Sequence, residues 1–399
     1  DYMVPSVFVM LNEFPLTPNG KVDRKALPIP EETISELKKD FIPPQTRLEK
    51  SLSKIWLDIL NIDHVSIHDN FFDIGGDSLL AVQFIALLRN NMDENLTVQN
   101  LYESPTISSL AELIKKKAGG NETWSPLVPI QKNGSQKPFF LIHAGDGNVV
   151  KYNELAVRLG QKRPFYGIQQ RAVNEENQED QTKIEMMASQ YIEAIREVQP
   201  NGPYLIGGYC TGGVIALEMA QQLQADNHEV AQLILIDTQV FPKDYYKDNV
   251  AMLALLLINF HVPLEKISPD IFQQAKQMSF DEIGALVFQA AQSHDRLSSE
   301  INFDQFKTII YSIKNIVTAM CKYDYHPFSG PITLINAERH HQYYDNYEGM
   351  PPLVSFWKKM SIQEFRVKNV PGTHHTCIEE PNVRIMAQQL NELFNEIGA

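Results

Sequence analysis

The sequence predicts two folded domains of different class: a small helical domain, then a larger α/β domain with a mostly parallel sheet. Before position 118, apolar residues recur at three- and four-residue spacing, which is the period of a helix. From position 138 onward, short apolar runs alternate with helical stretches, as in parallel sheets covered by helices. Residues 28–47 and 118–137 are rich in proline, glycine and polar residues, which is typical of linkers.

These two breaks divide the 399 residues into five segments. We expect a tail at residues 1–30, a linker at 31–45, the helical domain at 46–117, a second linker at 118–136 and the α/β domain at 137–399. Since the first residue is Asp1 rather than Met, we expect a piece of a longer polypeptide.

The helical domain is predicted from three stretches. A first helix carries one apolar stripe, formed by Leu48, Leu52, Ile55, Trp56 and Ile59. A second helix should begin near Ser78 and run through LLAVQFIALLRN. The last one, in SPTISSLAELIKKK, has Pro105 at its first helical position and lysines at its end, both of which favour a helix.

The α/β domain is predicted from its alternating runs. The strands are expected at residues 138–144, 165–168, 203–209, 231–237, 331–336 and 364–370, and helices at 186–198, 214–225 and 383–397. Residues from about 243 to 326 show helical periodicity and no convincing strand. We interpret this stretch as a helical insertion that forms a lid over a site.

Composition excludes several classes of partner. The net charge is −14 and the acidic residues are spread along the chain, which argues against nucleic acid because phosphate binding needs clustered Lys and Arg. No apolar run approaches the roughly 20 residues that span a membrane. Three cysteines, Cys210, Cys321 and Cys377, are too few for a disulfide framework. We therefore expect a cytoplasmic protein with reduced thiols and without nucleic-acid or membrane partners.

The stretch LIGGYCTGG (205–213) indicates a nucleophile. Gly208, Cys210 and Gly212 form the pattern G-x-C-x-G between a strand and a helix. This is the nucleophile elbow of α/β-hydrolases with sulfur in place of oxygen, in which small neighbours make room for a strained turn. The alternative is a glycine-rich turn around a buried, inert cysteine.

The rest of a catalytic triad follows in the order of that fold, which is nucleophile, acid, histidine. Asp237 ends the strand AQLILID, and His374 lies in GTHHT between the last strand and the last helix. We expect Cys210 to attack as thiolate, His374 to move the proton and Asp237 to orient the imidazole. Asp237 as a helix N-cap is the alternative, and His375 is expected beside the site or in solvent.

The oxyanion of a tetrahedral intermediate needs backbone N–H donors. We expect one from Thr211 and the other from the loop IHAGDGN, where Gly145 is favoured and Ala144 is the alternative. Cys377 is the second candidate nucleophile, but it lacks the elbow. The pair His340–His341 with Asp345 has no ligand spacing typical of a metal site, so no metal is expected.

The helical domain carries a further candidate site in DNFFDIGGDSLLAVQF (69–84). Ser78 begins an apolar helix, where the positive helix end favours an attached phosphate, although an N-cap serine is the alternative. The stretch resembles the attachment site of peptidyl carrier proteins, four-helix domains of this length. The resemblance implies covalent 4′-phosphopantetheine on Ser78, a phosphopantetheinyl transferase that attaches it, and Asp77 where many carriers have histidine.

The tail and the large domain extend the resemblance over nearly the whole chain. FPLTPNGKVDRKAL (14–27) is similar to the last motif of nonribosomal peptide adenylation domains, in which the lysine matching Lys21 contacts carboxylate and phosphate. IHAGDGN, GGYCTGG, LILIDT and GTHHT resemble the type I thioesterase of such synthetases, which has the α/β-hydrolase fold. Cys210 departs from the serine of most members. Adenylation and condensation domains upstream in the same synthetase are the implied partners, with carrier and thioesterase docking in cis.

The resemblance implies a terminal carrier–thioesterase unit. An acyl or peptidyl group would pass from the Ser78 arm to Cys210 and be released. Because a cysteine thioester retains activation, we expect closure of a strained ring, a β-lactone or β-lactam; hydrolysis and macrocyclisation are alternatives. A non-catalytic docking unit and an editing hydrolase are the other hypotheses.

Overall fold

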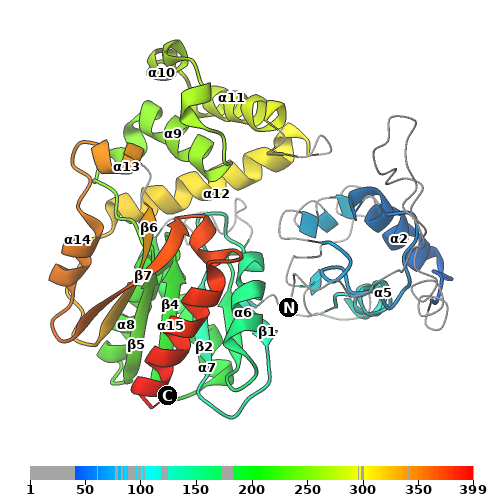
Figure 1. The fold of residues 1–399 in the computed structure, drawn as a ribbon, viewed down its shortest axis with the longest axis horizontal. Coiled ribbons are helices and arrows are strands. Elements are labelled where there is room, and N and C mark those ends of the chain that lie inside the picture. Colours follow the sequence, from blue (N-terminus) through cyan, green and yellow to red (C-terminus); the bar gives the residue numbers. More distant parts are fainter. Residues whose placement is uncertain are drawn as a thin grey trace, which may run out of the picture. The chain divides into compact units, whose positions relative to one another are not determined.

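The computed structural model describes residues 41–60, 62–76, 80–81, 84–85, 87–88, 96, 100–101, 104–117, 125–171, 183–294, 296–297, 301–339 and 342–398. The chain divides into two compact units. The first is built mostly from residues up to 120, and the second mostly from residues 121–399. Figure 1 draws both units, with the uncertain residues as a thin trace.

The first unit contains helices α2 (Arg47–Leu60) and α5 (Ile107–Lys117). The predicted stripe of α2 is buried at Leu52, Ile55, Trp56 and Ile59, and the Trp56 ring packs edge-on against the Phe71 ring at 5.1 Å. The helix begins where the Glu49 carboxylate accepts from the Thr46 N–H at 2.9 Å. The stretch in which the other helices of a four-helix domain are expected falls largely outside the described residues.

The second unit is built on a seven-stranded sheet with the strand order β1-β3-β2-β4-β5-β6-β7. Only the β1–β3 pair is antiparallel among these strands, so the prediction of a mostly parallel sheet is confirmed. The strands are β1 (Leu127–Gln131), β2 (Phe139–Ile142), β3 (Phe165–Ile168), β4 (Tyr204–Tyr209), β5 (Val230–Ile236), β6 (Ile332–Arg339) and β7 (Phe365–Thr373).

Strand β1 corrects the prediction of a linker at 118–136. Its sequence LVPIQ contains a proline, which argues against a strand in the middle of a sheet. The strand is tolerated because β1 lies at the sheet edge, where it pairs with β3 alone.

Both faces of the sheet are buried, which explains the continuous apolar character of its central strands. Phe140 and Ile142 belong to one core and Phe139 and Leu141 to the other. Helices α7 (Ile184–Val198) and α8 (Gly212–Ala225) cover the first core, and α6 (Asn153–Leu159) and α15 (Val383–Glu396) cover the second. Figure 1 shows α15 and α6 side by side on one face.

The segment between β5 and β6 is helical in its described residues. It contains α9 (Asn249–Asn259), α10 (Pro269–Ala275), α11 (Phe280–Ser293) and α12 (Phe303–Lys322). The Asp248 carboxylate caps α9 by accepting from the Val250 and Ala251 N–H groups, and Ser279 forms a capping box with Glu282 at the start of α11. Figure 1 shows these helices together at one end of the sheet.

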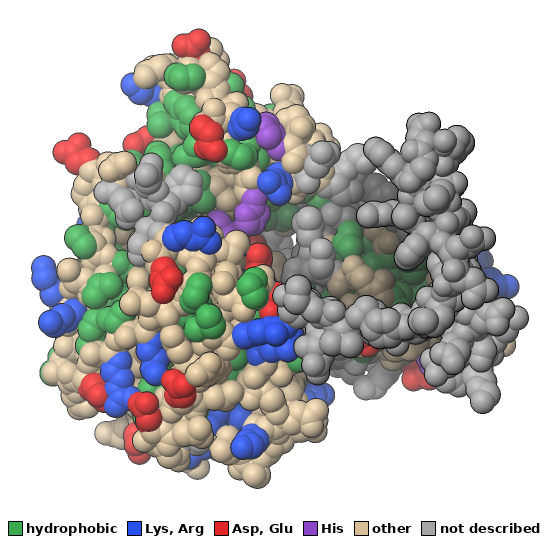
Figure 2. All heavy atoms as spheres, in the orientation of Figure 1, with side chains coloured by type: hydrophobic (Ala, Val, Ile, Leu, Met, Phe, Trp, Pro, Cys, Tyr) green, Lys and Arg blue, Asp and Glu red, His purple; other side chains and the backbone are tan. Residues whose placement is uncertain are grey.

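The surface of the second unit is mixed in charge. On the face drawn in Figure 2, basic and acidic side chains are interspersed over the sheet domain.

Helices α13 (Gln342–Asn346) and α14 (Leu353–Met360) connect β6 to β7. Within the described ranges, no helix is both long enough and apolar enough to cross a membrane.

Candidate active site

Cys210 occupies a strained turn between β4 and α8. Its φ angle is +58°, in the left-handed region that residues other than glycine rarely adopt. Its N–H donates to the Ile236 carbonyl at 2.9 Å, so strand β5 holds the turn in place. Such strain in a residue with a reactive side chain is typical of functional sites.

The glycines around Cys210 are required by close backbone approach. A Cβ on Gly208 would overlap the Gly212 backbone, and a Cβ on Gly212 would overlap the His143 carbonyl. A Cβ on Gly213 would overlap the Thr238 side chain. The turn is therefore packed between the loop after β2 and the loop after β5, and only hydrogen atoms fit at these positions.

Asp237 and His374 are hydrogen-bonded although they lie far apart in sequence. Asp237 follows β5, its φ is +43° and it is 1% exposed. Its Oδ1 accepts from the Ala337 N–H at 3.1 Å, and its Oδ2 accepts from His374 Nδ1 at 2.7 Å. Because the carboxylate accepts, Nδ1 carries the hydrogen, and Nε2 is the nitrogen left for Cys210.

The main chain of His374 is held from two sides. The Tyr209 hydroxyl donates to the His374 carbonyl at 2.6 Å, and the Cys377 thiol donates to the same oxygen at 3.3 Å. The His375 ring packs edge-on against the His374 ring at 5.0 Å and against the His261 ring at 4.6 Å. Of the histidine pair, His374 is thus the residue that contacts the acid.

The electrostatics of Cys210 and His374 are coupled. Burial raises the pKa of the Cys210 thiol, but the His374 imidazole, the Thr211 N–H and the Lys151 ammonium together bring that pKa below its usual value. Burial lowers the pKa of His374, but Cys210 and Asp237 outweigh it and raise that pKa. These opposite shifts favour a thiolate–imidazolium pair, the reactive form of a catalytic cysteine.

The other two thiols lie in different surroundings. Burial and the Asp237 charge raise the pKa of Cys377, which is 1% exposed. Burial raises the pKa of Cys321 to about 11. Cys321 lies near the end of α12 rather than in its middle. Both thiols are therefore protonated at neutral pH, and the runner-up nucleophile Cys377 packs as a small apolar residue.

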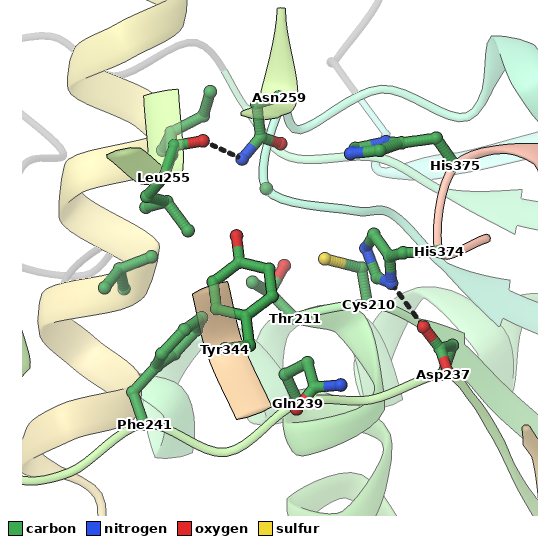
Figure 3. Close-up of a pocket in the computed structure, with 13 residues that line it drawn as sticks. Cys210, Thr211, Asp237, Gln239, Phe241, Leu255, Asn259, Tyr344, His374 and His375 are labelled. Carbon is green, nitrogen blue, oxygen red and sulfur yellow. Dashed lines mark hydrogen bonds and ion pairs between the residues drawn. The ribbon is translucent and has the colours of Figure 1, made fainter. Parts of the chain in front are cut away.

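A pocket lies between the strand ends and the helical insertion. Cys210, Asp237 and His374 line it from the sheet side, together with Thr211 and Gly145. The insertion and nearby loops supply an apolar wall, which consists of Phe241, Leu255, Ile313, Val317 and Tyr344. Figure 3 shows the Cys210 sulfur beside His374, with the Tyr344 hydroxyl directed into the same space.

The candidate oxyanion donors lie at this pocket. Thr211 is the cap residue of α8, where the first N–H groups of a helix have no intrahelical acceptor. Gly145 lines the pocket beside it. Ala144 is buried, and its carbonyl accepts from the His143 ring at 2.6 Å and from the Gly147 N–H at 3.0 Å. Gly145 rather than Ala144 lines the pocket, so Gly145 stays the favoured second donor.

Several residues at the site were not predicted from sequence. His143 is fully buried between Ala144 and the Tyr191 hydroxyl, 2.8 Å from its Nε2, and burial lowers its pKa to about 4. Gln239, Asn259 and Tyr344 line the pocket. Gln239, Asn259 and Tyr344 belong to no motif, whereas His143 lies within IHAGDGN, which was the signal that could have found it.

Ser78, the predicted attachment residue, lies outside the described residues, as does Lys21. The turn before Ser78 is described as far as Gly76. The Gly76 N–H donates to the Phe71 carbonyl at 2.8 Å, and a Cβ on Gly76 would overlap the Phe71 ring. Leu80 and Ala81 are helical.

The described residues contain no group of three or more potential metal ligands. His340 and His341 lie outside these residues, as does the Asp345 side chain.

Comparison with known proteins gives two family matches. Residues 137–393 match the family described as "Thioesterase domain", and residues 50–114 match the "Phosphopantetheine attachment site". The chain is 37% identical over 267 residues to a dimodular nonribosomal peptide synthase of Bacillus subtilis (strain 168), covering 66% of this chain and 11% of that protein. It is 27% identical over 414 residues to the chondramide synthase CmdD of Chondromyces crocatus, covering 100% and 10%.

One solved structure is similar over almost the whole chain. It is a holo four-domain nonribosomal peptide synthetase, AB3403, bound to AMP and glycine. The TM-score is 0.59 and the identity 28%, and the match covers 98% of this chain and 29% of that one. The chain thus spans about a tenth of the length of these curated relatives and less than a third of the solved synthetase.

Proposed function

Because the chain belongs to the thioesterase domain family and also carries a phosphopantetheine attachment domain, we propose that it is the carrier and release unit of a nonribosomal peptide synthetase. The family implies hydrolytic or release activity on thioesters. The relatives with which the chain aligns are synthetases of this kind, and they support the assignment. The proposal names Cys210, His374 and Asp237 as the catalytic residues.

The carrier domain holds covalent 4′-phosphopantetheine, and we assign its attachment to Ser78. When bound, this group supplies a long arm whose thiol carries the acyl chain as a thioester. The hydroxyl of a serine at a helix start is the nucleophile that such an attachment needs. The positive end of the helix stabilises the phosphate next to it.

The first step transfers the acyl group to Cys210. The Cys210 thiolate attacks the thioester carbonyl, and the N–H groups of Thr211 and Gly145 bind the oxygen that becomes negative. The bond between the carbonyl carbon and the original sulfur then breaks. His374 gives its Nε2 proton to the thiolate that departs, which leaves as a thiol. Asp237 accepts the Nδ1–H hydrogen bond throughout and stays ionised. This bond keeps the imidazole in the orientation that the transfer needs.

The second step releases the product. His374, now neutral, takes the proton of an incoming hydroxyl or N–H group, which attacks the acyl-Cys210 carbonyl. The carbon–sulfur bond breaks, and Cys210 leaves as thiolate. Since one thioester has replaced another, the activation of the acyl group is retained until this step, whereas a serine would convert it to a more stable oxyester.

We propose that the incoming group belongs to the acyl chain itself and closes a β-lactone or β-lactam. A strained ring needs an activated acyl donor, which the cysteine thioester provides. The apolar wall of Phe241, Leu255, Ile313 and Val317 supports this mode because it disfavours water as the second nucleophile. The helical insertion that carries part of this wall is assigned as the lid.

The observation that carries the proposal is the shared pocket of Cys210, His374 and Asp237, with the 2.7 Å Asp237–His374 hydrogen bond and a cysteine at φ +58°. Residues 1–30 are assigned to the C-terminal remnant of an adenylation domain, in which Lys21 is the lysine expected to contact carboxylate and phosphate. Upstream adenylation and condensation domains, and a phosphopantetheinyl transferase acting on Ser78, are the proposed partners.

The test loads the Ser78 arm of the full chain with a defined β-hydroxyacyl group and follows intact mass and released product together. We expect transient acylation of Cys210 and release of a product lighter than the free acid by one water. Ser78→Ala should not load, and Cys210→Ala should load but retain the acyl group on the arm. Release of the free acid alone would show that the product leaves by hydrolysis and not by cyclisation. Unchanged release by Cys210→Ala would contradict the proposed nucleophile.

A further inference from the structure

The pocket contains two side-chain amides that the proposed acyl transfer does not use. Gln239 lies just after Asp237 in the loop that follows β5, and Asn259 is the last residue of α9. Figure 3 shows them at opposite ends of the pocket, with Cys210 and Tyr344 between them. Amide groups in an otherwise apolar wall fix the orientation of a ligand and select for its polar groups.

The orientation of the Asn259 amide is determined by its own helix. Its Nδ2 lies 2.9 Å from the Leu255 carbonyl oxygen, and a carbonyl can only accept a hydrogen bond. The nitrogen must therefore face Leu255. The Oδ1 atom is turned away from Leu255, to the side on which His375 and Cys210 lie (Figure 3).

The Asn259 oxygen is left as an acceptor for a ligand. No group within the described ranges donates to Oδ1, and the side chain is only partly buried. An acyl chain that fills the pocket removes water from this oxygen. An acceptor that loses water without gaining a donor is destabilising, so the pocket favours an acyl group that brings an N–H donor.

Gln239 adds the complementary capacity. Its amide has both a donor and an acceptor and forms no hydrogen bond with the part of the chain that the structure describes. A peptide unit also has one donor and one acceptor, whereas a simple fatty acyl chain has neither. A peptide backbone can therefore pair with the two amides, whereas a hydrocarbon chain would leave both amides without a partner.

From this geometry we infer that Asn259 is a specificity-determining residue that accepts a hydrogen bond from an amide N–H of the acyl group. The inference rests on the proposed release function. It concerns which acyl groups the pocket accepts and is independent of whether release forms a ring or an acid.

The test compares two thioesters that differ in one group. The probes are the pantetheine thioesters of hexanoyl-alanine and of hexanoyl-lactate, in which an ester oxygen replaces the N–H. We expect the wild-type full chain to favour the amide in kcat/KM by about 10-fold, an order of magnitude for one neutral hydrogen bond. In Asn259→Leu the ratio of the two kcat/KM values should fall to about the ratio of the uncatalysed rates of the two thioesters. The fall should come mostly from a lower kcat/KM for the amide.

Asn249→Leu is the matched control. Asn249 lies on the same helix, and its Nδ2 also donates to a main-chain carbonyl, that of Met278, at 2.8 Å. It does not line the pocket, so its substitution should leave the preference unchanged. Alkylation of Cys210 reports whether each variant retains a folded site, and Asn259→Ser provides a second variant if Asn259→Leu does not fold.

The outcomes distinguish the role of Asn259 from the proposed release function. An Asn259 variant that keeps the amide preference of wild type, or a wild type without preference, overturns the inference while leaving the release function in place. A wild type in which neither thioester acylates Cys210 overturns the proposed function and this inference with it.

Discussion

The Tyr209 hydroxyl donates a hydrogen bond to the main-chain carbonyl of His374, with an oxygen–oxygen distance of 2.6 Å. The two rings are also stacked, with centroids 5.2 Å apart and an interplanar angle of 19°, and the Lys151 ammonium lies 5.4 Å from the Tyr209 ring centroid. Tyr209 directly precedes Cys210, so one segment carries the nucleophile and also positions its proton acceptor.

We therefore predict that Tyr209→Phe lowers kcat for release about 10-fold with little change in KM, as for a small displacement of a catalytic group. The ring stacking remains but the hydrogen bond to the His374 carbonyl is lost. Tyr204→Phe is the control, because the Tyr204 hydroxyl on the same strand donates to the Gln199 carbonyl at 3.0 Å, remote from the pocket. A purely structural role would make the two variants alike in kcat and in the pH midpoint of Cys210 alkylation.

The coupling of Cys210 and His374 predicts the pH dependence of thiol reactivity. Because the pKa of Cys210 is lowered, its thiolate should persist to lower pH, and the alkylation rate should rise with a midpoint below the usual thiol value of about 8.5. In His374→Ala the largest effect that opposes burial is lost, so the midpoint should move upward. Peptide mass mapping after iodoacetamide treatment at several pH values measures both midpoints.

Cys321 and Cys377 serve as internal references in that experiment, because the pKa of each is raised. They should label slowly at neutral pH in both proteins. Equal labelling of all three cysteines, or an unchanged midpoint in His374→Ala, would contradict the ion pair.

Replacing the sulfur should separate acylation from release. In Cys210→Ser we expect an oxyester on residue 210 that accumulates, because it is a poorer acyl donor than the thioester, and a smaller share of cyclic product. Stopped-time intact mass and product chromatography measure the two quantities. Cys321→Ala, which changes a buried thiol outside the pocket, should behave as wild type; the same product ratio and rate in Cys210→Ser would contradict a special role for sulfur.

The packing of the turn predicts a large loss of stability for Gly208→Ala. The added methyl group would overlap the Gly212 backbone, which cannot move without displacing α8, so we expect a decrease in the free energy of unfolding of about 3 kcal/mol or more. Gly145→Ala is the control, because its Cβ would meet neighbouring side chains at 3.7 Å or more, an ordinary contact. Urea denaturation of the two variants and wild type tests the difference, which should be absent if the turn relaxes freely.

Much of the fold could be predicted because its signals are local. The apolar runs of β2 to β6 follow from burial on both faces, and α15 follows from its periodicity. Strand β1 was missed because it depends on an edge position that the sequence does not encode locally. Ser78, predicted from its motif, lies outside the described residues and stays a prediction.

By itself the sequence indicated the strained turn, from the four glycines around Cys210, and it indicated an acid and a histidine from strand order. Only the tertiary structure decided which histidine contacts Asp237, that Tyr209 holds that histidine, and that Gln239, Asn259 and Tyr344 line the same pocket as Cys210. The physical reason is distance along the chain. Backbone strain depends on adjacent residues, whereas a pocket depends on side chains that only the folded sheet and its helical insertion bring together.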